Sequence, residues 1–177
     1  MKDREVVEAL YAQSMRRLSA YAFALVGSYS AAEELVQDAI VRTFSKRRRW
    51  QDLAAAESYV RAAIRNTHID AVRRDARWTA RLPKLIRTEE APGPEAAVEG
   101  DEAVAVALAA LPPRVRTAIV LRYLDDMTVA GVASAMSASE GTVKRYLSDG
   151  RALLSQHFEL TDEDEQTETV RVKEARR

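Results

Sequence analysis

The residues of this chain that are best suited to chemistry are a hydroxyl and two cations that follow a tight turn in its second half. Thr142, Lys144 and Arg145 lie near the start of an expected helix. Side chains of these types bind phosphate oxygens and base edges. In a helix-turn-helix, the second helix enters the major groove of DNA with its N-terminal residues facing the bases. Residues 128–154 therefore predict a DNA-binding hairpin, and the alternative is a helical hairpin that contacts no DNA.

A second group of cations and aromatic residues lies between residues 46 and 81. Strand separation exposes unstacked bases, which bind aromatic and polar side chains while cations neutralise the backbone. We expect Asn66 to offer its amide to such a base. The other members of the group are Trp50, Tyr59, Trp78, Lys46, Arg47, Arg48, Arg49, Arg61, Arg65, Arg73 and Arg74. The alternative is that Trp50 and Tyr59 are core residues and that the arginines form a solvated face.

The residue types argue against an enzyme. The chain has no cysteine, so disulfides, thiolate metal sites and cysteine nucleophiles are excluded. Its two histidines, His68 and His157, are too far apart in sequence to indicate a metal site. A glycine-rich phosphate loop and a Ser-His-Asp order are also missing. We therefore expect no metal, no cofactor and no small-molecule substrate. We also expect no membrane contact, because no apolar run approaches the roughly 18 residues that span a bilayer. A cytoplasmic location fits the lack of cysteine and of a long apolar run.

Helices are expected to position these residues, because the chain is 47% hydrophobic and 31% charged with only six Gly and five Pro. Apolar residues recur at three- and four-residue spacing, and capping boxes are predicted at Ser30 to Glu33 and at Ser137 to Glu140. The helices expected are about 7–25, 30–44, 54–77, 103–110, 113–124, 128–136 and 138–158. Gly150 is expected to bend or fray the last of them, because an interior glycine costs about 1 kcal/mol relative to alanine.

Charge is unevenly distributed along the chain although the net charge is zero. Residues 42–87 contain 13 Lys and Arg against four Asp and Glu, whereas residues 89–102 contain six acids and no base. The acidic stretch also contains Pro92-Gly93-Pro94, and like charges with helix breakers favour an extended tether. The sequence leaves open whether the parts on either side of it pack together. We predict a domain over 1–87, a flexible linker over 88–102, a domain over 103–160 and a charged, disordered tail over 161–177.

Both halves of the chain resemble a known family. Leu111-Pro112-Pro113-Arg114, Val120-Leu121-Arg122-Tyr123 and Glu140-Gly141-Thr142-Val143-Lys144 resemble, in order and spacing, region 4 of the extracytoplasmic-function sigma factors of the sigma-70 family. Residues 32–38 and the stretch from Tyr59 to Arg74 resemble region 2 of the same family. Within the family the chain is most similar to the short actinobacterial SigE-like type.

This resemblance implies an all-α protein made of a region 2 three-helix domain and a region 4 helix-turn-helix domain. Such a protein binds core RNA polymerase at its clamp and flap and directs it to promoter DNA without catalysing a reaction. The alternative is a free-standing helix-turn-helix regulator that binds operator DNA without polymerase. The sequence also leaves open whether an anti-sigma factor binds the protein.

The resemblance also implies roles for individual residues. Recognition of the -35 element is expected from Ser139, Thr142, Lys144 and Arg145. Recognition and melting of the -10 element are expected from Trp50, Tyr59, Arg61, Arg65, Asn66, Asp70, Arg73 and Arg74. Binding of core polymerase is expected from Glu33, Glu34, Leu35, Gln37 and Asp38. The alternative for these acids is the helix dipole alone, which favours negative charge in a first helical turn.

Overall fold

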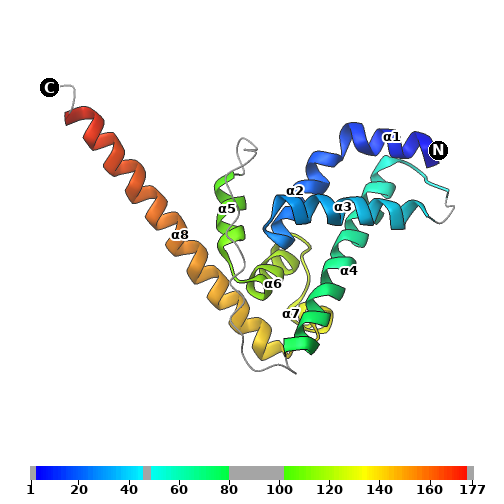
Figure 1. Ribbon diagram of the computed structural model, residues 1–177. Coiled ribbons are helices and arrows are strands. Elements are labelled where there is room, and N and C mark those ends of the chain that lie inside the picture. Colours follow the sequence, from blue (N-terminus) through cyan, green and yellow to red (C-terminus); the bar gives the residue numbers. More distant parts are fainter. Residues whose placement is uncertain (1–2, 46–48, 80–101, 175–177) are drawn as a thin grey trace.

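The protein is helical throughout the residues that its computed structural model describes, which are 3–45, 49–79 and 102–174 (Figure 1). These residues contain no strand, so the expected all-α fold is confirmed. The predicted linker lies outside the described residues, except for Glu102, which begins a helix. The helices are α1 (Asp3–Gln13), α2 (Met15–Val26), α3 (Tyr29–Phe44), α4 (Leu53–Thr79), α5 (Glu102–Ala110), α6 (Pro113–Tyr123), α7 (Val129–Met136) and α8 (Glu140–Glu174).

The first four helices form the N-terminal unit, in which α2, α3 and α4 pack against one another and α1 packs on α4. We expected one helix where the structure has α1 and α2, and a break at Ser14 corrects that prediction. Ser14 is fully buried, and its hydroxyl donates to Glu57 on α4 at 2.7 Å. Arg17 donates to both carboxylate oxygens of Glu57 at 2.8 and 2.6 Å and so lowers the pKa of that carboxyl. The break thus joins α1 and α2 to the start of α4.

The start of α3 differs from the predicted capping box. The helix begins at Tyr29, so Ser28 holds the cap position and makes no side-chain capping bond. Ser30 and Glu33 therefore lie inside the helix. The ring of Tyr29 stacks on Phe23 of α2 with centroids 4.3 Å apart, and this contact across the turn fixes the helix start. Aromatic packing at this position outweighs the local hydroxyl and carboxylate pattern.

The last four helices form the C-terminal unit, with α6 at its centre. Pro113 occupies the first turn of α6, where its missing N–H costs nothing, and residues 115–121 are all buried. Thr128 caps α7 by accepting from the Gly131 N–H at 3.0 Å, as predicted. Ser137 adopts a left-handed conformation at the end of α7, so the capping box predicted from Ser137 is wrong. Ser139 caps α8 instead, with its hydroxyl accepting from the Thr142 N–H at 3.1 Å.

The last helix is longer than predicted. We expected it to end near Phe158 and a disordered tail to follow from residue 161, whereas α8 continues through Glu174. No Gly or Pro follows Gly150 in the chain, and Glu, Gln and Arg are good helix formers, so the sequence contains no signal that would end the helix. The C-terminal part of α8 extends beyond the rest of the molecule (Figure 1).

The two units share one hydrophobic core. A single cluster of buried side chains runs from Val6 and Leu10 in α1 through the N-terminal unit to Val143 and Leu147 in α8. Between the units, α2 packs on α5 and α6, and α4 packs on α7. Figure 1 shows α6 and α7 lying alongside α4. None of the helices within the described ranges is both long and apolar enough to cross a membrane.

Gly150 has a packing role in place of the expected bend. It is buried where α8 crosses α6, and a β-carbon there would lie 2.7 Å from Ile119 Cγ1 and 3.0 Å from Val115 Cγ1. Carbon atoms in ordinary contact are about 3.5–4.0 Å apart, so a side chain would force α6 and α8 apart. The absence of a side chain at Gly150 therefore permits the close approach of these two helices.

We predict that Gly150→Ala lowers the free energy of unfolding by up to about 2 kcal/mol. Overpacking costs about 1–3 kcal/mol, and the gain of about 1 kcal/mol in helix propensity offsets only part of that cost. Gly141→Ala is the matched control, because a β-carbon at Gly141 would meet only Ser139 Oγ, at 3.8 Å. This second variant should be neutral or more stable than the parent. Urea unfolding followed by circular dichroism measures both, and equal effects would contradict the close packing of α6 on α8.

Candidate nucleic-acid interface

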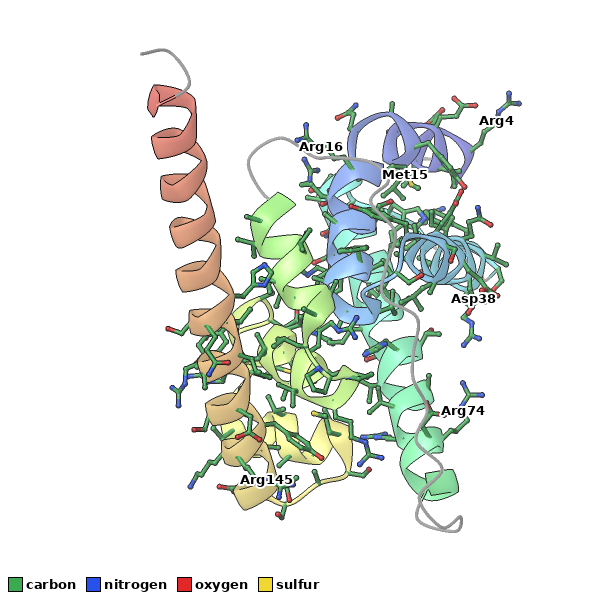
Figure 2. The ribbon with its side chains drawn as sticks, turned by 60° about the vertical axis from the view of Figure 1, so that its left-hand side comes forward. Arg4, Met15, Arg16, Asp38, Arg74 and Arg145 are labelled. Carbon is green, nitrogen blue, oxygen red and sulfur yellow. The ribbon has the colours of Figure 1, made fainter. Side chains whose placement is uncertain are left out.

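At the start of α8, the side chains predicted to be buried are buried and those predicted to face DNA are exposed. Val143 and Leu147 are buried against the hairpin core, with exposed fractions of 0% and 6%. Lys144 and Arg145 are exposed on the other side of the helix. In Figure 2, Arg145 lies beside the first turns of α8. The exposed cations therefore stand at the N-terminal end of α8, where a helix in the major groove faces base edges.

The two hydroxyls predicted to contact DNA also hold the helix start together. Ser139 Oγ lies 2.9 Å from Thr142 Oγ1 and accepts from the Thr142 N–H at 3.1 Å. The Val143 N–H donates to the Ser139 carbonyl at 3.0 Å. Ser139 is exposed and Thr142 is partly exposed. These bonds fix the first turn of α8 and leave both hydroxyl groups at the same surface as Lys144 and Arg145.

The aromatic residues predicted to stack on bases differ in exposure. Trp50 is 4% exposed and packs between Phe44 and Tyr59, with ring centroids 5.1 and 5.5 Å away. The core alternative therefore holds for Trp50, whose ring is buried in this structure and is not at the surface where a base could stack on it. Tyr59 is 51% exposed and keeps part of its ring at the surface. The side chain of Trp78 lies outside the described side chains.

The polar residues predicted along α4 fall into two sets. Asn66, Asp70 and Arg74 are exposed. Figure 2 shows Arg74 on the side of α4 that faces away from α8. The other set, Arg61, Arg65 and Arg73, faces the C-terminal unit. The arginines of the second set keep about a third to two fifths of their side chains exposed while the two units are packed together.

Asp125, in the loop between α6 and α7, is the centre of the contact between the two units. Its carboxylate is 3% exposed. Tyr21 of α2 donates to it at 2.6 Å, and Arg61 Nη2 donates to it at 3.2 Å. Arg65 Nη1 lies 3.9 Å from the same carboxylate. The Arg61 guanidinium also donates to the Leu124 carbonyl at 3.0 Å and lies 4.0 Å from the centre of the Tyr21 ring. Burial and the bond to Asp125 raise the pKa of the Tyr21 hydroxyl, so it remains a donor.

Arg73 makes a second contact between the units at the turn of the helix-turn-helix. Its Nε donates to the Ala135 carbonyl at 2.6 Å and its Nη2 donates to the Ser134 carbonyl at 3.0 Å. These carbonyls belong to the last turn of α7, where helical carbonyls lack partners within the helix and attract cations. The contact holds the predicted melting helix against the turn that precedes the recognition helix.

A third contact buries a histidine. His68 of α4 is 9% exposed, and its Nε2 lies 2.8 Å from Thr117 Oγ1 of α6. Thr117 donates its hydroxyl proton to the Pro113 carbonyl at 2.9 Å, so His68 Nε2 is the donor in the pair. Burial, together with the nearby Arg116 guanidinium, lowers the pKa of His68 to about 4. Arg116 itself packs over Gly27, where a β-carbon would overlap the guanidinium and where φ is +72°.

A cleft of about 580 Å³ opens between α4 and the α6–α7 hairpin. Its lining combines cations, an amide, a carboxylate and apolar side chains from both units. These residues are Arg65, Asn66, Ile69, Asp70, Arg73, Met127 and Ala135. The structure thus brings four of the predicted -10 residues together around one hollow, although part of its wall comes from the C-terminal unit.

The residues predicted to bind polymerase lie on α3, a different helix from those that carry the two predicted DNA-binding groups. Glu33, Glu34 and Gln37 are exposed. Asp38 forms an ion pair with Arg42 at 2.8 Å and points away from α8 in Figure 2. Leu35 is partly buried and packs against the hydrophobic core, so it contributes to the packing of α3. The exposed part of this group is an acidic and amide face on one helix.

Sequence reasoning missed the residues that join the two units. Asp125, Tyr21 and Thr117 have no motif, and their partners are 49 to 104 residues away in the chain. The sequence offered one signal for this contact. The acidic pair Asp125-Asp126 lies between two expected helices, and no local motif explains it. The part of the chain that the structure describes contains no group of three acidic or histidine side chains that could hold a metal ion.

Comparison with known proteins finds the same two regions. Residues 10–79 match the family model described as Sigma-70 region 2, and residues 101–154 match the model described as Sigma-70, region 4. The chain is 32% identical over 143 residues to the RNA polymerase sigma-E factor of Streptomyces antibioticus, which covers 75% of this chain and 73% of that protein. It is 31% identical over 138 residues to the RNA polymerase sigma-E factor of Streptomyces coelicolor, with 75% of each covered.

A similar solved structure is that of the sigma factor RpoE in complex with the anti-sigma factor NepR from Bartonella quintana. The sequence identity is 21%, and the match covers 88% of this chain and 95% of that chain with a TM-score of 0.49.

The buried His68 predicts a pH dependence of stability. Its pKa is about 4 in the folded protein and 6.5 when the ring is in water, so the unfolded chain binds more protons between these values. Stability is therefore lost as the pH falls from 6.5 towards 4. From pH 7.5 to 5.5 the loss due to His68 should be about 1 kcal/mol. Urea unfolding at both pH values should show this loss in the parent chain and not in His68→Gln. The same pH dependence in both proteins would show that His68 is not buried neutral.

Proposed function

The chain belongs to the sigma-70 family as an extracytoplasmic-function sigma factor, and from this premise we propose that its α3 binds core RNA polymerase while α4 and α8 read promoter DNA. The observation that carries the proposal is the start of α8. There Lys144 and Arg145 are exposed on a helix that the buried Val143 and Leu147 fix against the hairpin. The helix presents two cations and its own N-terminus to a groove, with no catalytic group beside them.

The -35 element is the proposed target of α8. Lys144 and Arg145 supply charge for phosphates and donors for base edges, and the hydroxyls of Ser139 and Thr142 lie at the same surface. Base contacts determine sequence preference, whereas phosphate contacts set the position of the helix on the duplex. The side chains of the first turn therefore decide which promoters are chosen.

The -10 element is the proposed target of α4. Tyr59 offers a half-exposed ring, and Asn66 offers an amide beside the cleft. Asp70 and Arg74 add a carboxylate and a cation on the exposed side of the helix. A separated strand needs this mixture, because its bases stack on rings and its backbone binds cations.

Core polymerase is the proposed partner of α3. Glu33, Glu34 and Gln37 form an exposed face with two negative charges and an amide. Asp38 belongs to the same face, although its charge is partly balanced by Arg42 at 2.8 Å. A basic surface of polymerase would complement this face, and Leu35 supports it from the core.

The test of the proposed function is a pull-down of core polymerase with the tagged full chain, followed by run-off transcription on genomic fragments. The proposal expects capture of core enzyme and transcripts that begin at defined sites only when the chain is added. A chain that binds duplex operator DNA tightly as a dimer, and captures no polymerase, would instead be a free-standing regulator.

We predict that Lys144→Ala in the holoenzyme weakens binding to a promoter fragment recovered in that screen. If Lys144 contacts a phosphate, the loss should be similar across sequences and the log–log salt dependence should fall by about one unit. A base contact would instead cost about 1–3 kcal/mol at one position of the -35 element. Arg151→Ala is the matched control, because it removes the same charge from an exposed site two turns further along α8.

Val143→Ala should have the opposite phenotype to Lys144→Ala. Removing buried methyl groups should lower the free energy of unfolding by about 1–2 kcal/mol while the DNA-contacting atoms stay in place. Thermal unfolding and promoter binding measured on both variants separate the two effects. If Lys144→Ala unfolds the protein and Val143→Ala loses only DNA binding, the assignment of the two faces of α8 is wrong.

A further inference from the structure

We propose that Asp149 of α8 is a specificity-determining residue, whose carboxylate accepts a hydrogen bond from the amino group of a cytosine in the duplex that α8 reads. This inference rests on the proposed function of α8 and adds to it a residue beyond the first turn and the identity of one base. Phosphates attract the cations of α8 on any duplex, but they repel a carboxylate. Asp149 can therefore favour binding only where it meets a donor on a base edge.

Asp149 lies on the same face of α8 as two residues of the DNA-facing surface. Thr142, Arg145 and Asp149 follow one another at spacings of three and four residues, so they form one row along the helix. A helix in the major groove places its base-contacting side chains at such spacings over about two turns. Arg145 and Asp149 are exposed, and Thr142 is partly exposed. The row therefore extends the reading surface one turn beyond Arg145.

The turn that carries Asp149 is packed tightly against α6. Leu147 is 6% exposed, and Gly150 is buried where the two helices cross. A β-carbon at Gly150 would lie 2.7 Å from Ile119 Cγ1, so the helices approach closely at this point. A binding side chain must be held to within about 0.5 Å of its productive position. The close packing at Gly150 fixes the direction in which the neighbouring Asp149 leaves the helix.

The carboxylate of Asp149 is available to a base. Arg145 lies one turn earlier on the helix, at a spacing from which it could pair with this acid. Within the ranges that the structure describes, however, the Asp149 side chain takes part in no ion pair or hydrogen bond. The Arg145 guanidinium lies 5.8 Å from the centre of the Tyr146 ring instead. Both oxygens of Asp149 therefore keep their capacity to accept from another molecule.

The chemistry of a carboxylate selects one base in the major groove, because an ionised carboxylate accepts hydrogen bonds and donates none. Guanine presents two acceptors there, and thymine presents an acceptor and a methyl group, so neither offers a donor. Adenine presents an amino donor beside the acceptor N7, which repels the carboxylate. Cytosine presents its N4 amino donor without an adjacent acceptor of its own, and Asp and Glu pair with it. Asp149 therefore favours cytosine.

The experiment compares the -35 preferences of holoenzymes that contain the parent chain, Asp149→Ala or Asp149→Asn. Promoter fragments recovered by run-off transcription are randomised across the -35 element, and the bound fraction is sequenced. The parent should prefer cytosine at one position by about tenfold, as expected for a good base contact. Asp149→Ala should lose that preference. Asp149→Asn should change it to adenine, because an amide pairs with N6 and N7 of that base together.

Asp126→Asn is the matched control, because it makes the same charge change at a fully exposed carboxylate in the loop between α6 and α7. This variant should keep the preference of the parent. A carboxylate that only repels phosphates would give a different result, in which Asp149→Asn binds every sequence more tightly with the parent's preferences unchanged. That result would overturn the proposal, and so would a preference for guanine or thymine at the position that responds to Asp149→Ala.

The outcomes separate this inference from the proposed function. Failure of the chain to capture core polymerase would contradict the function, and the same selection would then be made with the free chain on randomised duplex DNA. The cytosine preference and its response to the two variants decide the role of Asp149 there in the same way. Transcription from defined sites with equal -35 preferences in the parent and both variants would retain the function and remove the role of Asp149.

Discussion

The arrangement of the two units depends on the neutralisation of one buried carboxylate. The side chain of Asp125 is only 3% exposed, and a buried charge without partners is strongly disfavoured. Its partners are a phenol from α2 and two guanidinium groups from α4, so the C-terminal unit can bury this loop only where those helices present them. Buried ion pairs add little net stability compared with apolar contacts, but breaking one leaves an uncompensated charge. Asp125 therefore favours the arrangement in which Tyr21, Arg61 and Arg65 surround its carboxylate.

The other contacts between the units follow from that arrangement. Gly27 leaves room for the Arg116 guanidinium, and Thr117 accepts from the neutral His68 ring. Arg73 reaches the end of α7 and so links α4 to the turn before α8. In this arrangement the start of α8 presents Lys144 and Arg145 to solvent, while three arginines of α4 contact the C-terminal unit and stay partly exposed.

Sequence reasoning succeeded where the signal was local. The burial of Val143 and Leu147 with the exposure of Lys144 and Arg145 follows from helical periodicity, and the Thr128 cap follows from its position before an apolar run. It failed where two local signals competed or where tertiary contacts decided. Tyr29 stacked on Phe23 displaced the expected capping box, Ser139 capped α8 in place of Ser137, and Trp50 entered the core. The contact of Tyr21 with Asp125 spans 104 residues, and no periodicity or motif reports such a pairing.

The packing of the two units against each other in the free protein is the claim on which this account stands. Single-molecule energy transfer tests it most directly, because the chain has no cysteine and dyes can be placed by Ser58→Cys in α4 and Ser148→Cys in α8, both at exposed positions. The account predicts one narrow population for the free chain. A broad distribution of transfer efficiencies in the free chain would contradict it.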